Sequence, residues 1–498
     1  MSSGPIPPGV FETAGPAPDL IDSDEAGGAA LRGGALRTVG FAAGLMLSLV
    51  SAPLVIRHLG DAEFGRYSAV LAVVAIVGGL TEGGVNTVAL RELAVARDRD
   101  QRDRLMGDLL GLRLVLTATG VILAVGFAVI AGYGPSLVAG TALAGLGLIG
   151  ALAQSLLASV LQSQLRFGWA TIIDLLRQIV TTGLIVVLVI GDAGVVPFLA
   201  VSIPAGLASL AVTIVLIRGS ISLRPAFHPN RWLPLLRDTA VFAVAVAVNT
   251  LYFRITLVLM SVVAAAVETG YFAVSFRVME VLVNLPAILL GAAFPIISRT
   301  VWTDRPRFEQ TTARMFTLAL MLGTLISVAL VLGAPFAIEV LAGSQGHPST
   351  AVLQIQAAGI IATFLASATG YPLLSLHRNK ETLAANLVCL ATAIALTLAL
   401  TPTWGAKGAA VSAVSAEFFL AAVTTFALVR RGGVRVPLIE VPIVLLAGLA
   451  ALGVGLAVGI HPAVQAAVGS LAFLLILQLT GRFPAEVREL LARRVPGR

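Results

Sequence analysis

Three charged side chains lie inside long apolar runs near the middle of the chain. Arg254 is in the first run of the segment 249–299, and Arg277 and Glu280 are in the second, after a short break at 267–270. Counted from this break at ~1.5 Å per residue, Arg254 would lie ~13 Å deep in a membrane, Arg277 ~10 Å and Glu280 ~15 Å. A charge at this depth is unfavourable by ~3 kcal/mol or more unless protein or water surrounds it. The spacing therefore predicts a helical hairpin that keeps a charged pocket near mid-membrane.

An arginine at this depth indicates the binding of an anion. The planar guanidinium carries N–H donors in a fork that matches the oxygens of a phosphate group. We therefore expect Arg254 to bind an anionic head group rather than to fix helix packing. Arg277 and Glu280 are three residues apart and share one helix face. One possibility is that Arg277 and Glu280 neutralise each other. The other is that Arg277 faces the cavity beside Arg254, while Glu280 modifies the electrostatic environment of Arg277 or takes up a proton.

Two further carboxylates lie within apolar runs. Glu82 stands among glycines in the segment 78–86, which also contains Asn86. This pattern predicts either a loosely packed segment that admits water or an ion, or a close contact between helices. Glu417 would lie ~14 Å from the outer face, and Arg113 is expected to extend its side chain to the membrane surface. The candidate residues of the central cavity are Arg254, Arg277, Glu280, Glu82, Asn86 and Glu417.

The elements that carry these charges must be membrane-spanning helices. Hydrophobic residues make up 57% of the 498 and charged residues 12%, and the mean hydropathy is +0.96. These values indicate an all-α polytopic membrane protein. The net charge of +7 does not indicate nucleic-acid binding, because the basic residues gather in short loops between apolar runs. The single cysteine, Cys389, excludes a disulfide framework and a cysteine-based metal site.

About fourteen apolar runs are long enough to cross a bilayer, and the loops between them predict their orientation. Every second loop is rich in arginine, beginning with residues 97–104, whereas the opposite set holds only Arg57, Arg66 and Lys407. We therefore expect both termini in the cytoplasm. The expected spans are 36–56, 67–90, 109–132, 137–163, 169–190, 196–217, 238–263, 270–297, 313–337, 350–375, 382–401, 408–429, 438–458 and 463–480.

An internal repeat predicts the division of the chain. Residues 63–69 resemble 268–273, and residues 191–194 resemble 405–408. Both offsets are a little over ~200 residues, so spans 1–6 and 7–12 are expected to form two six-helix lobes in the same orientation, a parallel repeat. The expected parts are a disordered cytoplasmic tail (1–31), two lobes (32–235 and 236–432), helices 13 and 14 (433–481) and a basic cytoplasmic tail (482–498).

The sequence lacks the motifs of several membrane enzymes. No GxxxxGK[ST] loop occurs, and the five histidines are scattered without metal-ligand spacing. Neither a built-in ATPase nor a metal site is therefore expected. The loops on the outer side are short, which disfavours a glycosyltransferase or polymerase that acts on an external substrate. We expect no enzyme activity and no cofactor.

Several motifs resemble those of a known transporter family. The segment 57–67, RHLGDAEFGRY, resembles the R-x-L-G-x-x-x-F-G-x-Y signature after the first helix of polysaccharide flippases. These are the O-antigen-type transporters of the multidrug/oligosaccharidyl-lipid/polysaccharide exporter superfamily. The same pattern is matched by RELA at 91–94, ETGY at 268–271, PIIS at 295–298 and GAKGAA at 405–410. The resemblance extends over about 36–440.

The resemblance implies a flippase of the bacterial plasma membrane. A polyprenyl-pyrophosphate-linked oligosaccharide would pass from the inner to the outer leaflet by alternating access between the two lobes. Family members keep basic residues in the central cavity, and Arg254 is at a position in the seventh span where they commonly occur. An acidic residue often follows in the family, whereas residues 255–258 here are ITLV. The expected partners are the lipid-linked oligosaccharide, the bilayer, and a glycan polymerase or other polysaccharide-assembly proteins.

Other functions stay open from the sequence. An ion-coupled small-molecule antiporter of the same superfamily would be expected to have carboxylates rather than arginines dominating the cavity. A peptidoglycan-precursor flippase would share the mechanism and carry a different glycan. A membrane glycosyltransferase or a non-transporting scaffold would account less well for charges held at mid-depth.

Overall fold

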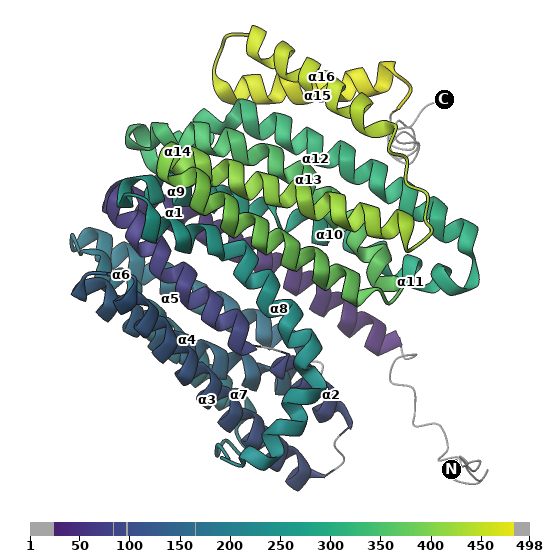
Figure 1. Ribbon diagram of the computed structural model, residues 1–498. Coiled ribbons are helices and arrows are strands. Elements are labelled where there is room, and N and C mark those ends of the chain that lie inside the picture. The colour runs from purple at the N-terminus through teal and green to yellow at the C-terminus, as the bar shows by residue number, and fades with distance from the viewer. Residues whose placement is uncertain (1–23, 83, 96–97, 165, 483–498) are drawn as a thin grey trace.

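The chain is helical throughout the part that the structure describes. The computed structural model describes residues 24–82, 84–95, 98–164 and 166–482, and within these ranges it holds helices and no strand (Figure 1). The predicted all-α fold is confirmed. The elements are α1 (Asp24–Glu82), α2 (Val85–Val95), α3 (Arg99–Ile130), α4 (Pro135–Ser163), α5 (Phe167–Ile190), α6 (Val195–Ala200), α7 (Ser202–Ile217), α8 (Pro229–Val263), α9 (Ala266–Leu282), α10 (Leu285–Gly291), α11 (Phe294–Thr303), α12 (Arg305–Ala342), the 3-10 helix η1 (Gly343–Gly346), α13 (His347–Ser375), α14 (Asn379–Arg430), α15 (Glu440–Ala457) and α16 (Pro462–Leu479).

Glycines break the longest helical runs. A straight helix of the 59 residues of α1 would be ~88 Å long, about three times the hydrocarbon core of a bilayer. Non-helical backbone interrupts α1 at Gly60 (φ 69°) and α14 at Gly405 (φ 55°), and Gly343 (φ 66°) separates α12 from α13. Only glycine adopts such positive φ angles without strain. Among the described residues, 11 helical runs are long and apolar enough to cross a membrane, so the fourteen separate spans and the internal repeat stay predictions.

Helices α1, α8 and α9 form the centre of the molecule. In Figure 1, α3–α7 lie on one side of this centre and α12–α14 on the other. Helix α1 packs against α5 in the first half of the chain and against both α8 and α9. Helix α8 also packs against α14. The contact between the two halves is therefore made mainly by α1 with α8 and α9.

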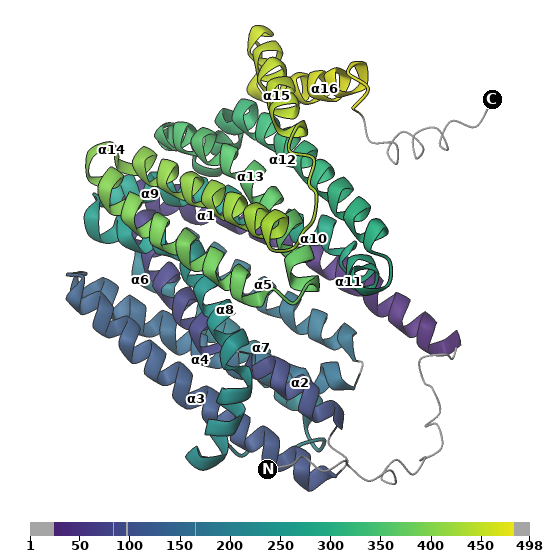
Figure 2. The ribbon, with the colours of Figure 1, turned by 45° about the vertical axis from the view of Figure 1, so that its right-hand side comes forward.

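The pair α15–α16 lies beyond α12, away from this centre (Figure 2). Its helices approach α12 closely through glycines: an added Cβ at Gly448 would lie 2.6 Å from a Thr324 methyl, and one at Gly455 or Gly469 would meet Leu332. Small residues at these points let the helix backbones come together. The pair thus covers the outside of the second half and contributes nothing to the centre.

One apolar core joins the two halves, and another lies within the first half. A large cluster that includes Phe272, Ile338 and Phe364 joins α9, α12 and α13 and extends to α1 and α8. A second cluster, with Met106 and Leu156, fills the space between α2, α3 and α4. The first cluster also includes Ile185 of α5 and Phe198 of α6, so apolar packing holds the two halves together.

Two glycines set the closest contact between the halves. A Cβ added at Gly65 of α1 would lie 2.4 Å from the Ala266 carbonyl oxygen, and one at Gly270 of α9 would lie 1.9 Å from the Asp61 carbonyl oxygen. The backbones of α1 and α9 therefore touch where only hydrogen atoms fit. These are the two glycines that the sequence similarity between 63–69 and 268–273 pairs with each other.

The segment that enters the second half is fastened to the first. The Ala226 amide donates to the Gly107 carbonyl (2.9 Å), and the Asp103 carboxylate accepts from the Ser222 amide (2.7 Å). The buried carboxylate of Asp108 in α3 contacts His228 (2.9 Å) and Arg231 (3.4 Å) at the start of α8. The beginning of α8 is therefore held on α3, so any movement between the halves must occur further along α8.

The structure changes some predicted boundaries. The hairpin connection lies at 264–265, and the predicted break at 267–270 lies in the first turn of α9. The predicted span 270–297 is interrupted twice, before Pro286 and before Pro295, because proline cannot continue the hydrogen bonding of the preceding turn. Helix α1 begins at Asp24, so residues 24–31 of the tail that was expected to be disordered are helical. Residues 1–23 and 483–498 lie outside the described part.

Replacing Gly270 with alanine should destabilise the protein by ~1–3 kcal/mol, because the new methyl group would overlap the Asp61 carbonyl and force the helices apart. Thermal unfolding of the purified protein in detergent would measure the effect. Gly183→Ala in α5 is the matched control, since its Cβ would meet nothing within 4 Å and alanine favours a helix. Equal melting of Gly270→Ala and the wild type would refute the close contact.

Candidate functional site

The three charged residues at the centre of the sequence line one small pocket. This pocket, of about 100 Å³, lies between α1, α8 and α9 and contains Arg254, Arg277 and Glu280. The structure thus brings these three predicted residues together. Its other lining residues are Ser51, Ala52, Val55, Phe64, Tyr67, Ser68, Leu71, Ile185, Leu257, Ala273 and Phe276.

Glu280 is shared between two arginines. One of its carboxylate oxygens lies 2.5 Å from Arg254 Nη2 of the neighbouring helix, and the other lies 2.7 Å from Arg277 Nη1 on the same helix. A second guanidinium nitrogen of Arg277 donates to the Ser48 hydroxyl of α1 at 3.2 Å. Two positive charges and one negative charge leave this group with a net charge of +1.

Aromatic rings hold Arg254 in place. The centre of its guanidinium lies 5.5 Å from the ring of Phe253 and 5.6 Å from the ring of Phe276, within the range of cation–π attraction. The Arg254 side chain is 25% exposed, whereas that of Arg277 is 43% exposed. Arg254 is therefore fixed at the back of the pocket, and Arg277 is the more accessible cation. Nothing in the sequence distinguished these two phenylalanines from the many that face lipid.

The arrangement suits an anion with several oxygens. Each guanidinium has five N–H donors, and Glu280 occupies only part of them. An anion that enters beside Arg277 can use the remaining donors, and it competes with Glu280 for the two arginines. Because surrounding protein lowers the local dielectric, the net charge of the group attracts an anion more strongly than the same charges would at a surface.

Glu82 and Asn86 belong to a different cluster, at the break between α1 and α2. The Asn86 amide donates to Glu82 (3.1 Å) and to the Ser155 hydroxyl of α4 (2.8 Å). Arg113 of α3 donates to the Asn86 side-chain oxygen at 3.0 Å. Neither Glu82 nor Asn86 lines the pocket of Arg254. The six candidate residues of a central cavity are therefore distributed over more than one site.

Arg113 is buried rather than extended to the membrane surface, so the expectation for this residue was wrong. Its side chain is 1% exposed, and it donates to the Thr81 carbonyl oxygen at 2.9 Å. A helix end leaves carbonyl groups without helical partners, and hydrocarbon offers none. The guanidinium supplies such a partner where α1 ends. The sequence signal was present, since glycines 83 and 84 mark the break that needs a donor.

Glu417 forms a third polar centre, between α8, α13 and α14. Its carboxylate accepts hydrogen bonds from the Tyr252 hydroxyl and from the Thr363 hydroxyl (3.0 Å). It lines a second small pocket of about 60 Å³, of which Phe276 is also a wall. Phe276 thus forms part of the wall of both the pocket of Glu417 and the pocket of Arg254. Glu417 is near the charged pocket but does not line it.

The sequence matches a known family, and the fold matches known transporters. Residues 30–301, more than half of the chain, match the family described as polysaccharide biosynthesis protein. The fold matches the lipid II flippase MurJ in an inward closed conformation with a TM-score of 0.74 and 14% identity, over 90% of this chain and 99% of that one. No curated protein matches the sequence.

Two further solved structures have a related fold. An inward-facing multidrug resistance MATE family transporter of the MOP superfamily matches with a TM-score of 0.64 and 14% identity, over 79% of this chain and 98% of that one. A MOP superfamily transporter from Pyrococcus furiosus matches with a TM-score of 0.56 and 14% identity, over 81% of this chain and 95% of that one. At such identities the likeness concerns the fold. The chain is a multi-pass membrane protein with the fold of MurJ and MATE transporters, and it belongs to the polysaccharide biosynthesis protein family.

Proposed function

We propose that this protein carries a polyprenyl-pyrophosphate-linked oligosaccharide from the inner to the outer leaflet of the bacterial plasma membrane, for the assembly of a surface polysaccharide. The observation that supports this proposal best is the shared carboxylate of Glu280 between Arg254 and Arg277. It leaves a cationic site about 14 Å from the end of α8 by helical rise.

The substrate and the site complement each other in charge and shape. A diphosphate is an anion with oxygens on both phosphorus atoms, and guanidinium groups match such oxygens in pairs. The pocket itself, at about 100 Å³, has room for a small anionic group but not for a glycan. The sugar and the lipid tail must therefore lie outside it, in the space that opens between the two halves and in the bilayer.

The contacts between the halves support transport by alternating access. Arg57 of α1 donates to the carbonyl oxygens of Glu339 (3.0 Å) and Val340 (2.7 Å) near the end of α12. Together with the touching glycines Gly65 and Gly270, this contact closes one end of the interface between the halves. The arginine-rich loops lie at the opposite end, so the positive-inside rule makes the closed end the outer one, with both termini in the cytoplasm. The charged pocket would then receive its substrate from the inner leaflet.

Glu280 would act as a built-in counter-ion. Without substrate it keeps two arginines neutralised in part, and the entering diphosphate takes over its hydrogen bonds. When the diphosphate leaves on the outer side, Glu280 pairs with the arginines again and favours release. The energy would come from an ion gradient, the membrane potential or consumption of the product by a glycan polymerase, since the sequence has no ATPase motif.

An ion-coupled antiporter is the second candidate function, because of Glu417. This carboxylate is held by two neutral hydroxyl groups, those of Tyr252 and Thr363, rather than by a cation. Such a group can take up and release a proton or a cation during a transport cycle. The arginines favour a flippase, however, because an exporter of cationic drugs would gain nothing from a positive pocket. Other glycans, including a peptidoglycan precursor, would use the same cationic site.

Arg254→Ala should lower surface polysaccharide by about tenfold or more, equivalent to ~1.4 kcal/mol or more of lost binding, when it replaces the wild type in a deletion strain. Lipid-linked oligosaccharide should accumulate inside the cell. The Arg254→Lys strain should have a level of surface polysaccharide between those of the wild type and the Arg254→Ala strain, because lysine keeps the charge and loses the paired donors. The measurements are surface polymer and extracted lipid-linked oligosaccharide, at matched protein levels.

Arg307→Ala, at an exposed position in α12, is the control and should behave as the wild type. Normal surface polymer in the Arg254→Ala strain would contradict the proposal.

Glu280→Gln should strengthen the binding of a diphosphate and slow its transport, because the group then keeps a charge of +2 without an internal competitor. Titration of the purified protein with farnesyl pyrophosphate should give a dissociation constant several times lower than that of the wild type. The same titration on Arg277→Ala should give weaker binding. Weaker binding to Glu280→Gln than to the wild type would show that Glu280 positions the arginines rather than competing with the anion.

A further inference from the structure

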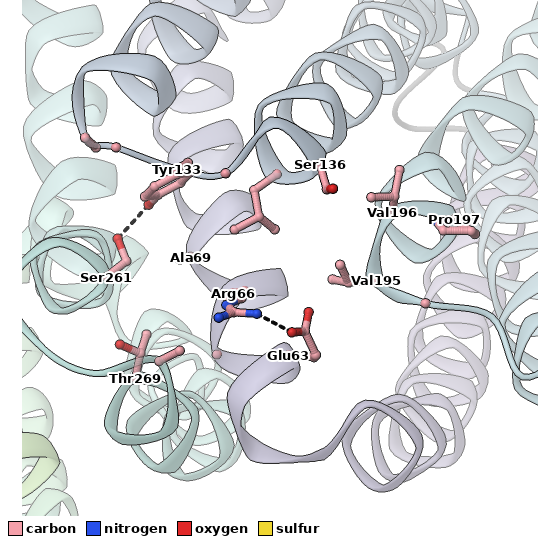
Figure 3. A pocket seen from close by; sticks show the side chains of 17 residues that line it. Glu63, Arg66, Ala69, Tyr133, Ser136, Val195, Val196, Pro197, Ser261 and Thr269 are labelled. Carbon is pink, nitrogen blue, oxygen red and sulfur yellow. Dashed lines mark hydrogen bonds and ion pairs between the residues drawn. The ribbon is translucent and has the colours of Figure 1, made fainter.

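The described residues also line a cavity that is much larger than the charged pocket. It has a volume of about 670 Å³ and lies at the closed end of the interface, next to the crossing of α1 and α9. We call it the outer vestibule. Figure 3 shows Glu63 and Arg66 of α1 in its middle, with Tyr133 and Ser261 on one side and Val196 and Pro197 on the other.

The outer vestibule is separate from the pocket of Arg254. Glu63, Arg66 and Ala69 of α1 line the vestibule, whereas Phe64, Tyr67 and Ser68 line the charged pocket. At ~100° per residue these two sets point to opposite faces of the same helix. The body of α1 therefore stands between the two cavities, and a ligand in one does not touch the other.

The charges in the vestibule cancel each other. Arg66 and Glu63 form an ion pair, and the other lining residues are neutral. The side chains of this pair are 49% and 38% exposed, so most of the five N–H donors of Arg66 and several lone pairs of Glu63 remain open to the cavity. An anion would meet Glu63 and a cation would meet Arg66. The chemistry therefore fits a neutral ligand that both donates and accepts hydrogen bonds.

Neighbouring hydroxyl groups of a sugar have this property. One hydroxyl can donate to Glu63 while the adjacent one accepts from Arg66, and the hydroxyls of Tyr133 and Ser136 offer further partners on the wall. The Tyr133 ring, supported edge-on by Phe127 at 6.3 Å, adds a flat apolar surface for the C–H face of a sugar ring. The volume is within the ~300–1,000 Å³ typical of small-molecule sites.

We propose that the outer vestibule binds a neutral oligosaccharide on the outer side of the membrane, of the kind found in the polymer that the cell displays. The proposal rests on the proposed function, from which it takes the class of ligand and the orientation. It assigns a second sugar site, apart from the transport path of the diphosphate.

Binding here would be coupled to the position of the two halves. Tyr133, between α3 and α4, donates to the Ser261 hydroxyl of α8 at 2.6 Å, because Ser261 itself donates to the Val258 carbonyl. The wall of the vestibule thus comes from both halves, and it exists in this form only while the outer end is closed. A ligand that prefers this form must stabilise it. Oligosaccharide outside the cell would therefore slow further export.

The test is a calorimetric titration of the full-length protein in lipid nanodiscs. The ligands are oligosaccharides released from the source organism's own surface polysaccharide. Gly134→Phe is the central variant. Gly134 lines the vestibule with φ −60°, and a Cβ there meets no atom within 4 Å, so we expect a large side chain at this position to occupy part of the cavity. Gly126→Phe in α3 is the matched control, because its Cβ is equally free and it does not line the vestibule.

Saturable binding to the wild type should weaken at least tenfold in Gly134→Phe and stay unchanged in Gly126→Phe and in Arg254→Ala. Gly194→Phe, at a second open position of the wall with φ −73°, should repeat the loss. The proposal is overturned if the wild type binds none of the oligosaccharides, if it binds only acidic ones, or if Gly134→Phe binds normally. Loss of binding in Arg254→Ala alone would place the sugar in the charged pocket, which overturns this inference and leaves the proposed function standing. Normal surface polymer in the Arg254→Ala strain would refute the function instead.

Discussion

The pairing of two arginines with one carboxylate inside a membrane protein constrains the rest of this structure. A buried charge is unfavourable unless an opposite charge and hydrogen bonds compensate it. Arg254 comes from α8, while Arg277 and Glu280 come from α9, so the ion pairs fix how these two helices lie against each other. The hydrogen bond from Arg277 to Ser48 adds α1 to the same group. The charges therefore hold together the three helices at which the two halves meet.

Backbone polarity imposes a second constraint. In hydrocarbon, each amide and carbonyl needs a partner inside the protein, so helices can break only where the freed groups find one. The break between α1 and α2 meets this need with Arg113, and the end of α12 meets it with Arg57. The first arginine stays within one half of the chain. The second crosses from one half to the other, so its hydrogen bonds exist only while the halves are closed at that end.

The polar groups of the interior form three centres rather than one cavity. The cationic centre at Arg254 lies between α1, α8 and α9, the cluster of Glu82 and Asn86 lies in the first half, and Glu417 lies in the second. Phe276 is in the wall of both the cationic pocket and the pocket of Glu417. A shift of this one ring would change the surroundings of both centres. Such a shift would link the state of Glu417 to the proposed anion site.

The sequence by itself determined the class of fold and placed Arg254, Arg277 and Glu280 at similar depths within it. Apolar runs of membrane length can only be helices, because no other single segment satisfies its own backbone. Charges within them must face protein or water, so Arg254, Arg277 and Glu280 were candidates for one pocket, together with three residues that the structure places elsewhere. The glycine pairs that resemble each other in sequence, Gly65 and Gly270, also proved to be contact points.

Only the tertiary structure decided which charges share a site. Depth along a helix is a one-dimensional quantity, and it places Glu417 and Arg254 at similar levels without saying which way either side chain turns. The rotation of α14 directs Glu417 to Tyr252 and Thr363, and the packing of α3 buries Arg113 at a helix end. The outer vestibule was equally invisible, because its wall is assembled from four separate segments between Glu63 and Thr269, the last of which belongs to the second half.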